Sequence, residues 1–322
     1  MKGLQKDPAP GRKRLRSSFA KHEARWFYIL VSPWIIGFIV FTAYPLFTSI
    51  FYSFTNWNLF EPWKFIGLRN YERLMGDSMF WRAVSNTFYY ALIYVPLSMI
   101  LSLLVAALLS QNIAGKRIFR TIFYIPTLIP VVVTALLFFR ILAPEGGLVN
   151  QFLRLLGIGG REWFFSPAWS KPALVLMSLW GLGMPFILLL SGMKGIPTEL
   201  YESARIDGSN RWIEFRHITL PMITPVLFYN LVMGIISSLQ IFTQVYVIGL
   251  NPLMPGGSTG SGGGPDNSLL SIVQLLYIRG FRDYRMGYAS AIAWILFIVT
   301  LIFTLLVFRS STLWVYYEED RK

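Results

Sequence analysis

The sequence contains no cysteine and only two histidines among its 322 residues. It therefore cannot form a disulfide, a thiolate metal site or a cysteine nucleophile. His22 and His217 both lie outside the long apolar runs. We therefore expect no histidine metal cluster, and no metal site, in this chain.

Charged residues are also scarce: they make up 14% of the chain, against 54% hydrophobic residues. With a mean hydropathy of +0.52, this composition predicts an all-α polytopic membrane protein rather than a soluble domain. The net charge of +13 is attributed to cytoplasmic loops that face anionic lipid headgroups. We therefore expect membrane lipid, and no nucleic acid, as a partner.

Two chemical signatures are missing. The phosphate-binding motif G-x-x-x-x-G-K-[ST] occurs nowhere, and no lysine follows the glycines of the stretch 251–265, for which we expect a flexible connection. No Asp, Glu, Lys, Arg or His lies within the cores of the apolar runs, where ion-coupled transporters usually carry one. The chain is therefore predicted not to be an enzyme, and the missing intramembrane charges argue against ion coupling within it.

The apolar residues form runs long enough to cross a membrane, which takes about 20 residues each. The six runs are 27–50, 86–109, 119–141, 172–193, 221–248 and 287–308. Pro126 and Pro130 in the third run and Pro185 in the fourth predict kinks. We divide the chain into a basic tail, 1–25, a six-helix transmembrane domain, 26–316, and a C-terminal tail, 317–322.

The distribution of Lys and Arg predicts the orientation of these runs. Of the 29 basic residues, 18 lie in the N-terminal tail, around Lys116, in the segment 194–216 and after the last run. Because cytoplasmic segments carry an excess of Lys and Arg, we expect both termini in the cytoplasm. The basic tail is expected to be unstructured at least as far as Ser18.

The longest charged, amphipathic stretch between two apolar runs extends from Ile196 to Pro221, and we call residues 196–218 the elbow. Pro197 suits the first turn of a helix, and Asp207-Gly208 predicts its end because glycine enters the left-handed conformation without steric cost. Ser209 is predicted to cap a second short helix. The apolar faces are expected to comprise Leu200, Tyr201, Ala204 and Ile206 in the first helix and Trp212, Ile213 and Phe215 in the second.

The elbow resembles the EAA signature of ATP-binding-cassette importer permeases, E-A-A-x-x-D-G-A, five residues, then F-x-x-I-x-L-P. The spacing matches throughout, with serine in place of alanine at Ser203 and Ser209. The resemblance implies a type I importer permease fold in which the elbow docks on an ATP-hydrolysing subunit. The residues that it assigns to this coupling are Glu202, Ser203, Ala204, Asp207, Gly208 and Phe215. The alternative interpretation is an amphipathic interfacial helix between two spans.

Further segments resemble the carbohydrate branch of that family, of the maltose and glycerol-phosphate type. They include Ser32-Pro33-Trp34, Gly67-Leu68-Arg69-Asn70-Tyr71, Asn86-Thr87, Gly147-Leu148-Val149-Asn150 and Gly287-Tyr288-Ala289-Ser290-Ala291. The resemblance implies a second homologous permease, two ATPase subunits and an extracytoplasmic substrate-binding protein. It also implies a bacterial or archaeal cytoplasmic membrane as the location. We expect no cofactor in this chain itself; ATP and Mg²⁺ would bind the partner ATPase.

Neutral polar and aromatic side chains in the spans are candidates for a sugar pathway, because a polyol needs amide or hydroxyl partners and a flat ring. The fifth run carries Asn230, Gln240, Gln244 and Tyr246 at spacings that can share one helical stripe, and Trp180 and Tyr288 are further candidates. The alternative is that these amides tie neighbouring helices together.

The sequence therefore predicts a permease subunit of an ATP-driven importer for sugars or oligosaccharides. A glycerol-phosphate importer subunit, an ion-coupled secondary transporter and a membrane enzyme that acts on lipid-linked sugar are the alternatives. No span carries a cation that could hold a phosphate, although Arg140 or a partner subunit could supply one.

Overall fold

The fold was analysed in a computed structural model that describes residues 11–111, 113–251 and 262–316, with no side-chain detail for residues 11–21. This part of the chain is all-α, as predicted, and an isolated antiparallel bridge between Thr55 and Phe65 is its one extended pairing. Most of the glycine-rich stretch 251–265, for which we predicted flexibility, lies outside the described residues.

Four helical segments in the described ranges are long and apolar enough to cross a membrane without a sharp bend. The first, His22–Ser53, comprises most of α1 (Gly11–Phe38), a π-helical turn (Ile39–Ala43) and α2 (Tyr44–Ser53). The others are α4 (Ser78–Ser110), α13 (Thr224–Leu239) with α14 (Thr243–Gly249), and α16 (Met286–Trp314).

Two further spans are bent pairs of helices. α5 (Lys116–Leu128) and α6 (Val131–Ile141) meet at 103°, and α8 (Pro167–Leu179) and α9 (Gly183–Lys194) meet at 46°. With each pair counted as one span, the described residues carry the six predicted spans.

The predicted prolines explain both bends. Pro130 lacks an amide hydrogen and forces Ile129 into an extended conformation, with φ −79° and ψ 127°, so α5 ends there. In the second pair the Pro185 ring would collide with the carbonyl four residues earlier in a continuous helix. The chain therefore breaks at Trp180–Leu182, between α8 and α9.

Short elements connect the spans. They are α3 (Arg69–Gly76), α7 (Leu148–Leu155), α10 (Thr198–Ile206), α11 (Arg211–Glu214), α12 (Leu220–Met222) and α15 (Ile272–Tyr277). Two π-helical turns, Phe215–Thr219 and Ile278–Arg282, and a 3₁₀ turn, Pro265–Asn267, complete the described part.

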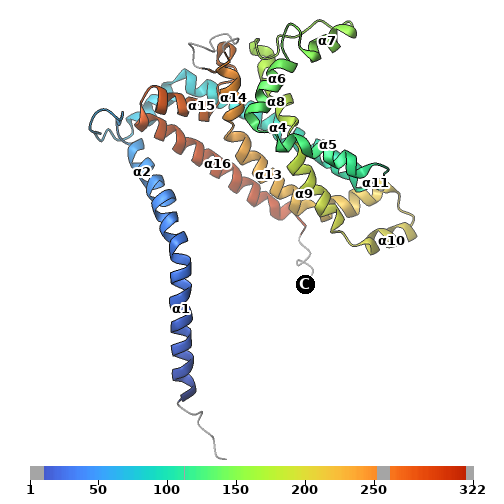
Figure 1. The fold of residues 1–322 in the computed structure, drawn as a ribbon, viewed down its shortest axis with the longest axis horizontal. Helices are drawn as coiled ribbons and strands as arrows, with labels where there is room; N and C mark the ends of the chain where they lie inside the picture. The colour runs from blue at the N-terminus through green and yellow to red at the C-terminus, as the bar shows by residue number, and fades with distance from the viewer. Residues whose placement is uncertain (1–10, 112, 252–261, 317–322) are drawn as a thin grey trace, which may run out of the picture.

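Helix α4 is the centre of the bundle (Figure 1), and its residues enter all three hydrophobic clusters. At its first end Phe80 and Ala83 pack with α3, α15 and α16, and farther along Tyr90 packs with α6, α8 and α14. At its other end Ala106 and Leu109 pack with α9 and the start of α13. Helices α5, α8, α9 and α13 are therefore held against α4 itself, and α6 and α16 are held against α8 and α13.

The first span lies apart from this bundle. Figure 1 shows α1 extending away from the other helices, and only α2 packs closely against α16. Its apolar side chains, including Trp26 and Phe41, are exposed. Helix α1 begins at Gly11, so the prediction of an unstructured tail as far as Ser18 is wrong for residues 11–18. The basic residues there continue the helix of the span, because Arg, Lys and Leu are good helix formers.

Three buried asparagines hold the loops between spans in place. Asn70 donates to the carbonyls of Ser53 and Thr55, each at 2.8 Å. Asn86 donates to the carbonyls of Asn267 and Leu270. Asn150 bonds both ends of the loop around α7. Because a buried backbone carbonyl needs a donor, each amide replaces hydrogen bonds that water would otherwise supply.

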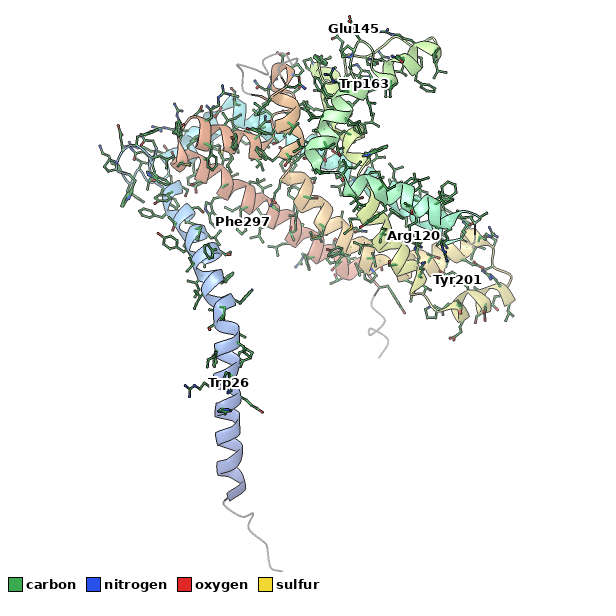
Figure 2. The ribbon with its side chains drawn as sticks, in the orientation of Figure 1. Trp26, Arg120, Glu145, Trp163, Tyr201 and Phe297 are labelled. Carbon is green, nitrogen blue, oxygen red and sulfur yellow. The ribbon has the colours of Figure 1, made fainter. Side chains whose placement is uncertain are left out.

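The two ends of the bundle carry different elements. Figure 2 shows Tyr201, in the elbow, at one end, and Glu145 and Trp163 at the other. The C-terminal end of α16 lies toward the elbow end, where the Tyr316 amide donates to the Thr224 hydroxyl at 2.8 Å.

Candidate functional site

The elbow has the predicted form of helix, glycine and helix. Pro197 precedes α10 as its N-cap, one position before the predicted first turn. Gly208 follows the helix with φ +82°, and the Ser209 amide donates back to the Ala204 carbonyl at 2.9 Å. This is the hydrogen-bond pattern of a left-handed C-terminal cap, which a side chain at position 208 would strain.

The predicted cap of the second helix is wrong by one residue. Asn210 is the N-cap of α11, and its side-chain oxygen accepts from the Ile213 amide at 2.9 Å. Both serine and asparagine can perform this role. Gly208 turns the chain so that Asn210, at φ −93° and ψ 168°, has the extended conformation that an N-cap requires.

An ion pair joins the two helices of the elbow. Arg205 of α10 donates to Glu214 of α11 from two of its guanidinium nitrogens, from Nε to Oε1 at 2.8 Å and from Nη2 to Oε2 at 3.4 Å. Glu214 is only 8% exposed, and its hydrogen bond and charge raise the pKa of Arg205. The Tyr201 and Thr219 hydroxyls, 2.9 Å apart, form a second link. Glu214 could not be singled out from the sequence, because a carboxylate on a short amphipathic helix is expected on its solvated side.

The apolar side chains of the elbow do not form the predicted buried faces. Tyr201, Ala204 and Phe215 are partly buried, but Ile206 is 87% and Trp212 is 67% exposed, and Leu200 and Ile213 are exposed as well. Exposed apolar side chains at the end of a bundle are typical of a surface that a partner covers. The elbow therefore buries the Glu214 carboxylate, leaves its partner Arg205 largely exposed, and presents apolar residues outward.

Behind the elbow lies a cavity of about 780 Å³, which we call the elbow cavity. Its wall includes the end of α4 with Gln111, together with Tyr201, Arg205 and Glu214. Arg211 NH1 donates to Gln111 Oε1 at 3.3 Å and so connects α11 to the C-cap of α4. The elbow is thus bonded to the central helix across an open space.

Four signature residues, Glu202, Ser203, Asp207 and Gly208, lie exposed on α10 and its C-terminal turn. Ala204 and Phe215 are partly buried, and Phe215 packs against the hydrophobic cluster of α4, α9 and α13. Exposed acidic groups beside exposed apolar ones give this surface both charge and contact area for a partner.

The candidate pathway residues do not share one stripe, because the fifth run is not one continuous helix. Helix α13 ends at Leu239, and Phe242, with φ −139° and ψ −61°, separates it from α14. No proline or glycine causes this break. The Ser271 hydroxyl donates to the Ile241 carbonyl at 2.8 Å and so stabilises the interruption from another element.

Asn230 is buried and donates to the Pro185 carbonyl at 3.3 Å. This contact ties α13 to α9, as the helix-tying interpretation predicts. The exposed stripe of α13 consists instead of Tyr229, Met233, Ser237 and Gln240. Met233 and Tyr229 were missed because periodicity cannot tell which face of an apolar helix is left open.

The remaining candidates lie in three different environments. Tyr246 contacts Tyr277, with their hydroxyls 3.3 Å apart, beside Phe242. Trp180 is exposed at the break between α8 and α9. Tyr288 donates to Asp77 at 2.9 Å, at the opposite end of the bundle from the elbow. Of the six candidates, only Gln240 and the partly buried Gln244 have neither a side-chain hydrogen bond nor an aromatic ring contact among the described residues.

A family described as "Binding-protein-dependent transport system inner membrane component" matches residues 98–314. This range contains the elbow and four of the six predicted spans in full. It excludes the first span, which is also the span that lies apart from the bundle.

Two relatives are similar over almost the whole chain. The "Probable ABC transporter permease protein YesP" of Bacillus subtilis (strain 168) is 38% identical over 92% of this chain and 93% of its own. The "Trehalose/maltose transport system permease protein MalF" of Thermococcus litoralis is 31% identical over 92% of this chain and 96% of its own.

A similar fold has been solved in the "bacterial alginate ABC transporter in complex with alginate pentasaccharide-bound periplasmic protein". One chain of that structure matches with a TM-score of 0.77 and 23% identity, over 91% of this chain and 96% of its own. The arrangement of spans described above is therefore that of a type I importer permease.

Proposed function

The chain belongs to the binding-protein-dependent transport system inner membrane components, and we propose that it is the permease subunit of an ATP-driven importer of sugars or oligosaccharides. The observation that carries this proposal is the elbow, with its left-handed Gly208 and its exposed apolar and acidic side chains. The substrate class is taken from relatives, which include permeases named for trehalose/maltose, multiple sugars and arabinooligosaccharides.

The other subunits of the proposed transporter are inferred from the same family membership. A second, homologous permease would supply the other half of the pathway, and two ATPase subunits with bound ATP and Mg²⁺ would dock on the elbows. An extracytoplasmic binding protein, of the kind named in the alginate transporter structure, would deliver the sugar. Exposed apolar side chains at the elbow support the docking step, since a partner that covers Ile206 and Trp212 removes them from water.

The orientation that we propose places the elbow and both termini in the cytoplasm and the end with Glu145 and Trp163 outside. Figures 1 and 2 support it, because the start of α1, the end of α16 and the elbow lie toward one side. The excess of Lys and Arg in those segments supports the same assignment.

The pathway is proposed to run along the open stripe of α13 that ends at Gln240, next to Gln244. The first of these side chains is exposed and the second partly buried, and both are amides that can bond a sugar hydroxyl. Asn230 is assigned to helix packing instead, because its amide is already bonded to Pro185.

The proposal is tested by reconstituting this chain with its second permease, ATPase and binding protein in lipid vesicles. We expect a sugar or oligosaccharide to stimulate ATP hydrolysis and to enter the vesicle, and only when the binding protein is present. This chain purified alone should hydrolyse no ATP. Exclusive stimulation by glycerol-3-phosphate would replace the sugar with a phosphate ester, and uptake driven by a proton gradient without ATP would contradict the importer.

A further inference from the structure

A second cavity, of about 710 Å³, lies at the opposite end of α4 from the elbow cavity. The loop after α2, helix α3 and the first residues of α4 and α16 surround it. Three arginines, Arg73, Arg279 and Arg285, line it with a single carboxylate, Asp77. We call it the arginine cavity.

The three guanidinium groups differ in their partners. Arg279 is bonded to Asp283 at 2.9 Å and to Asp77 at 3.4 Å, but its buried Nε has no hydrogen-bond partner in the described ranges. Arg73 and Arg285 are exposed and have no carboxylate within ion-pair distance among the described residues. The cavity therefore has two uncompensated positive charges at its rim and an unsatisfied donor in its wall.

The walls of the cavity are held in place by the surrounding backbone. The Gly287 amide donates to the Trp57 carbonyl at 3.0 Å, and the Thr55 carbonyl lies where a side chain at position 287 would begin. Tyr288 donates to Asp77, whose other oxygen accepts from the Met79 amide at the start of α4. A ligand would therefore meet a fixed backbone and an Arg279 that is already held by Asp77 and Asp283, so only Arg73 and Arg285 have to be ordered on binding.

We propose that the arginine cavity receives an aspartate or glutamate side chain of the extracytoplasmic binding protein. The inference rests on the proposed function and on its orientation, which places this cavity outside. A carboxylate can take paired N–H donors from one guanidinium and the charge of a second. The site lies at exposed helix ends rather than between spans, which suits a side chain presented by a folded partner better than a sugar in transit.

Binding at the arginine cavity would also affect the central helix, α4, through Asp77. Asp77 is the N-cap of α4 and also bonds Arg279 and Tyr288. A second carboxylate among the same arginines competes with Asp77 for Arg279. Docking would therefore change the contacts of Asp77, which caps the first turn of α4.

The test measures the affinity of the purified binding protein for the complete transporter in nanodiscs. We expect Arg73→Gln and Arg285→Gln each to weaken binding about tenfold, mainly through faster dissociation. Arg69→Gln is the matched control, because Arg69 lies one turn earlier on α3, is exposed and does not line the cavity. Arg73→Lys should fall between parent and Arg73→Gln, since lysine keeps the charge but loses the paired donors.

A cross-linking experiment then identifies the partner group. The chain has no native cysteine, so Arg73→Cys can be paired with single cysteines that replace, one at a time, acidic and neighbouring non-acidic residues on the binding protein. We expect at least one acidic position to form a disulfide with Arg73→Cys. Cross-links only to non-acidic positions would overturn the assignment.

The outcomes separate this inference from the proposed function. If the parent complex binds no binding protein and imports no sugar, the proposed function fails. If the parent binds it and the Arg73 and Arg285 variants bind as well as Arg69→Gln, only this inference fails. Glucuronate, titrated without binding protein at constant ionic strength, is the remaining arm: binding that Arg73→Gln abolishes would make the cavity a sugar-acid site and overturn the protein carboxylate.

Discussion

The two cavities at the ends of α4 have similar volumes, about 780 and 710 Å³, but opposite surfaces. At the elbow the buried Glu214 neutralises Arg205, whose side chain is 64% exposed, and the apolar Ile206 and Trp212 are exposed. At the outer end the arginines Arg73 and Arg285 are themselves exposed. Lasting interfaces are more apolar than transient ones, whereas surface charge mainly speeds association. The difference indicates a permanent partner at the elbow and a transient one outside.

The change with the largest expected effect is Gly208→Pro, which should lower import to below about a tenth of the parent rate, because proline cannot adopt φ +82°. It would also remove the amide that donates to Arg205. Insertion should be unaffected, and import and sugar-stimulated ATPase should fall together in reconstituted vesicles. Gly208→Ala, which keeps the amide, is the milder control, and parent-like import by Gly208→Pro would remove the elbow from coupling.

Breaking the ion pair of the elbow should come next. Arg205→Gln is expected to lower the ratio of import to ATP hydrolysis by about tenfold, because the buried Glu214 carboxylate loses its partner, and Glu214→Gln should have a smaller effect, because Arg205 remains in contact with water. The double variant should recover part of the loss, since two amides can bond each other. The ratio is the measurement, with complex yield as the control. Purely additive losses would show that the two residues act separately.

Salt offers a smaller effect and compares the two ends directly. Raising NaCl from low to high concentration should weaken association of the binding protein about fivefold, because exposed charges are screened beyond a Debye length. Association of the ATPase with the elbow should change little, since apolar contact is not screened. Both affinities can be measured on the same nanodisc sample. Equal salt dependence at the two ends would remove the distinction drawn between them.

The smallest effect is expected in the pathway. Gln240→Leu should lower import about threefold without loss of assembled complex, in line with one hydrogen bond of about 0.6 kcal/mol. Gln244→Leu should behave likewise. Asn230→Leu is the contrasting variant and should lower the yield of complex instead, because it removes the bond to Pro185. Import at the parent rate by both glutamine variants would exclude them as ligands.

The features that could be predicted are those set by neighbouring residues. Gly208 after Asp207 determines a left-handed turn locally, and the bend before Val131 follows from Pro130 alone. Both were expected before any tertiary contact was known. The spans were predicted for a related reason, since a long apolar run is itself the signal.

The features that could not be predicted depend on distant contacts. The break after Leu239 contains neither proline nor glycine and is stabilised by Ser271. Burial of Glu214 depends on Arg205 in another helix. The arginine cavity brings together Arg73 and Asp77 with Arg279 and Arg285, some 200 residues away in the chain. No local pattern contains such pairings, so Tyr288 is the one residue of the outer cavity that the sequence-based site contained.

Helix α4 connects the arginine cavity to the elbow cavity and can transmit movement between them. It is 33 residues long, with Asp77 as one cap and Gln111 as the other, and at 1.5 Å per residue it is a rod of about 50 Å. A rod of that length that tilts by about 5° moves one end by about 4 Å relative to the other, more than the reach of a hydrogen bond. Because its two caps are bonded to Arg279 and to Arg211, such a tilt would break or form contacts at both faces of the membrane at once. Pro96 lies near the middle of α4, where a missing backbone hydrogen bond allows the helix to bend. The bending stiffness of α4 at Pro96 would therefore determine how much of a displacement at its outer end is transmitted to its cytoplasmic end.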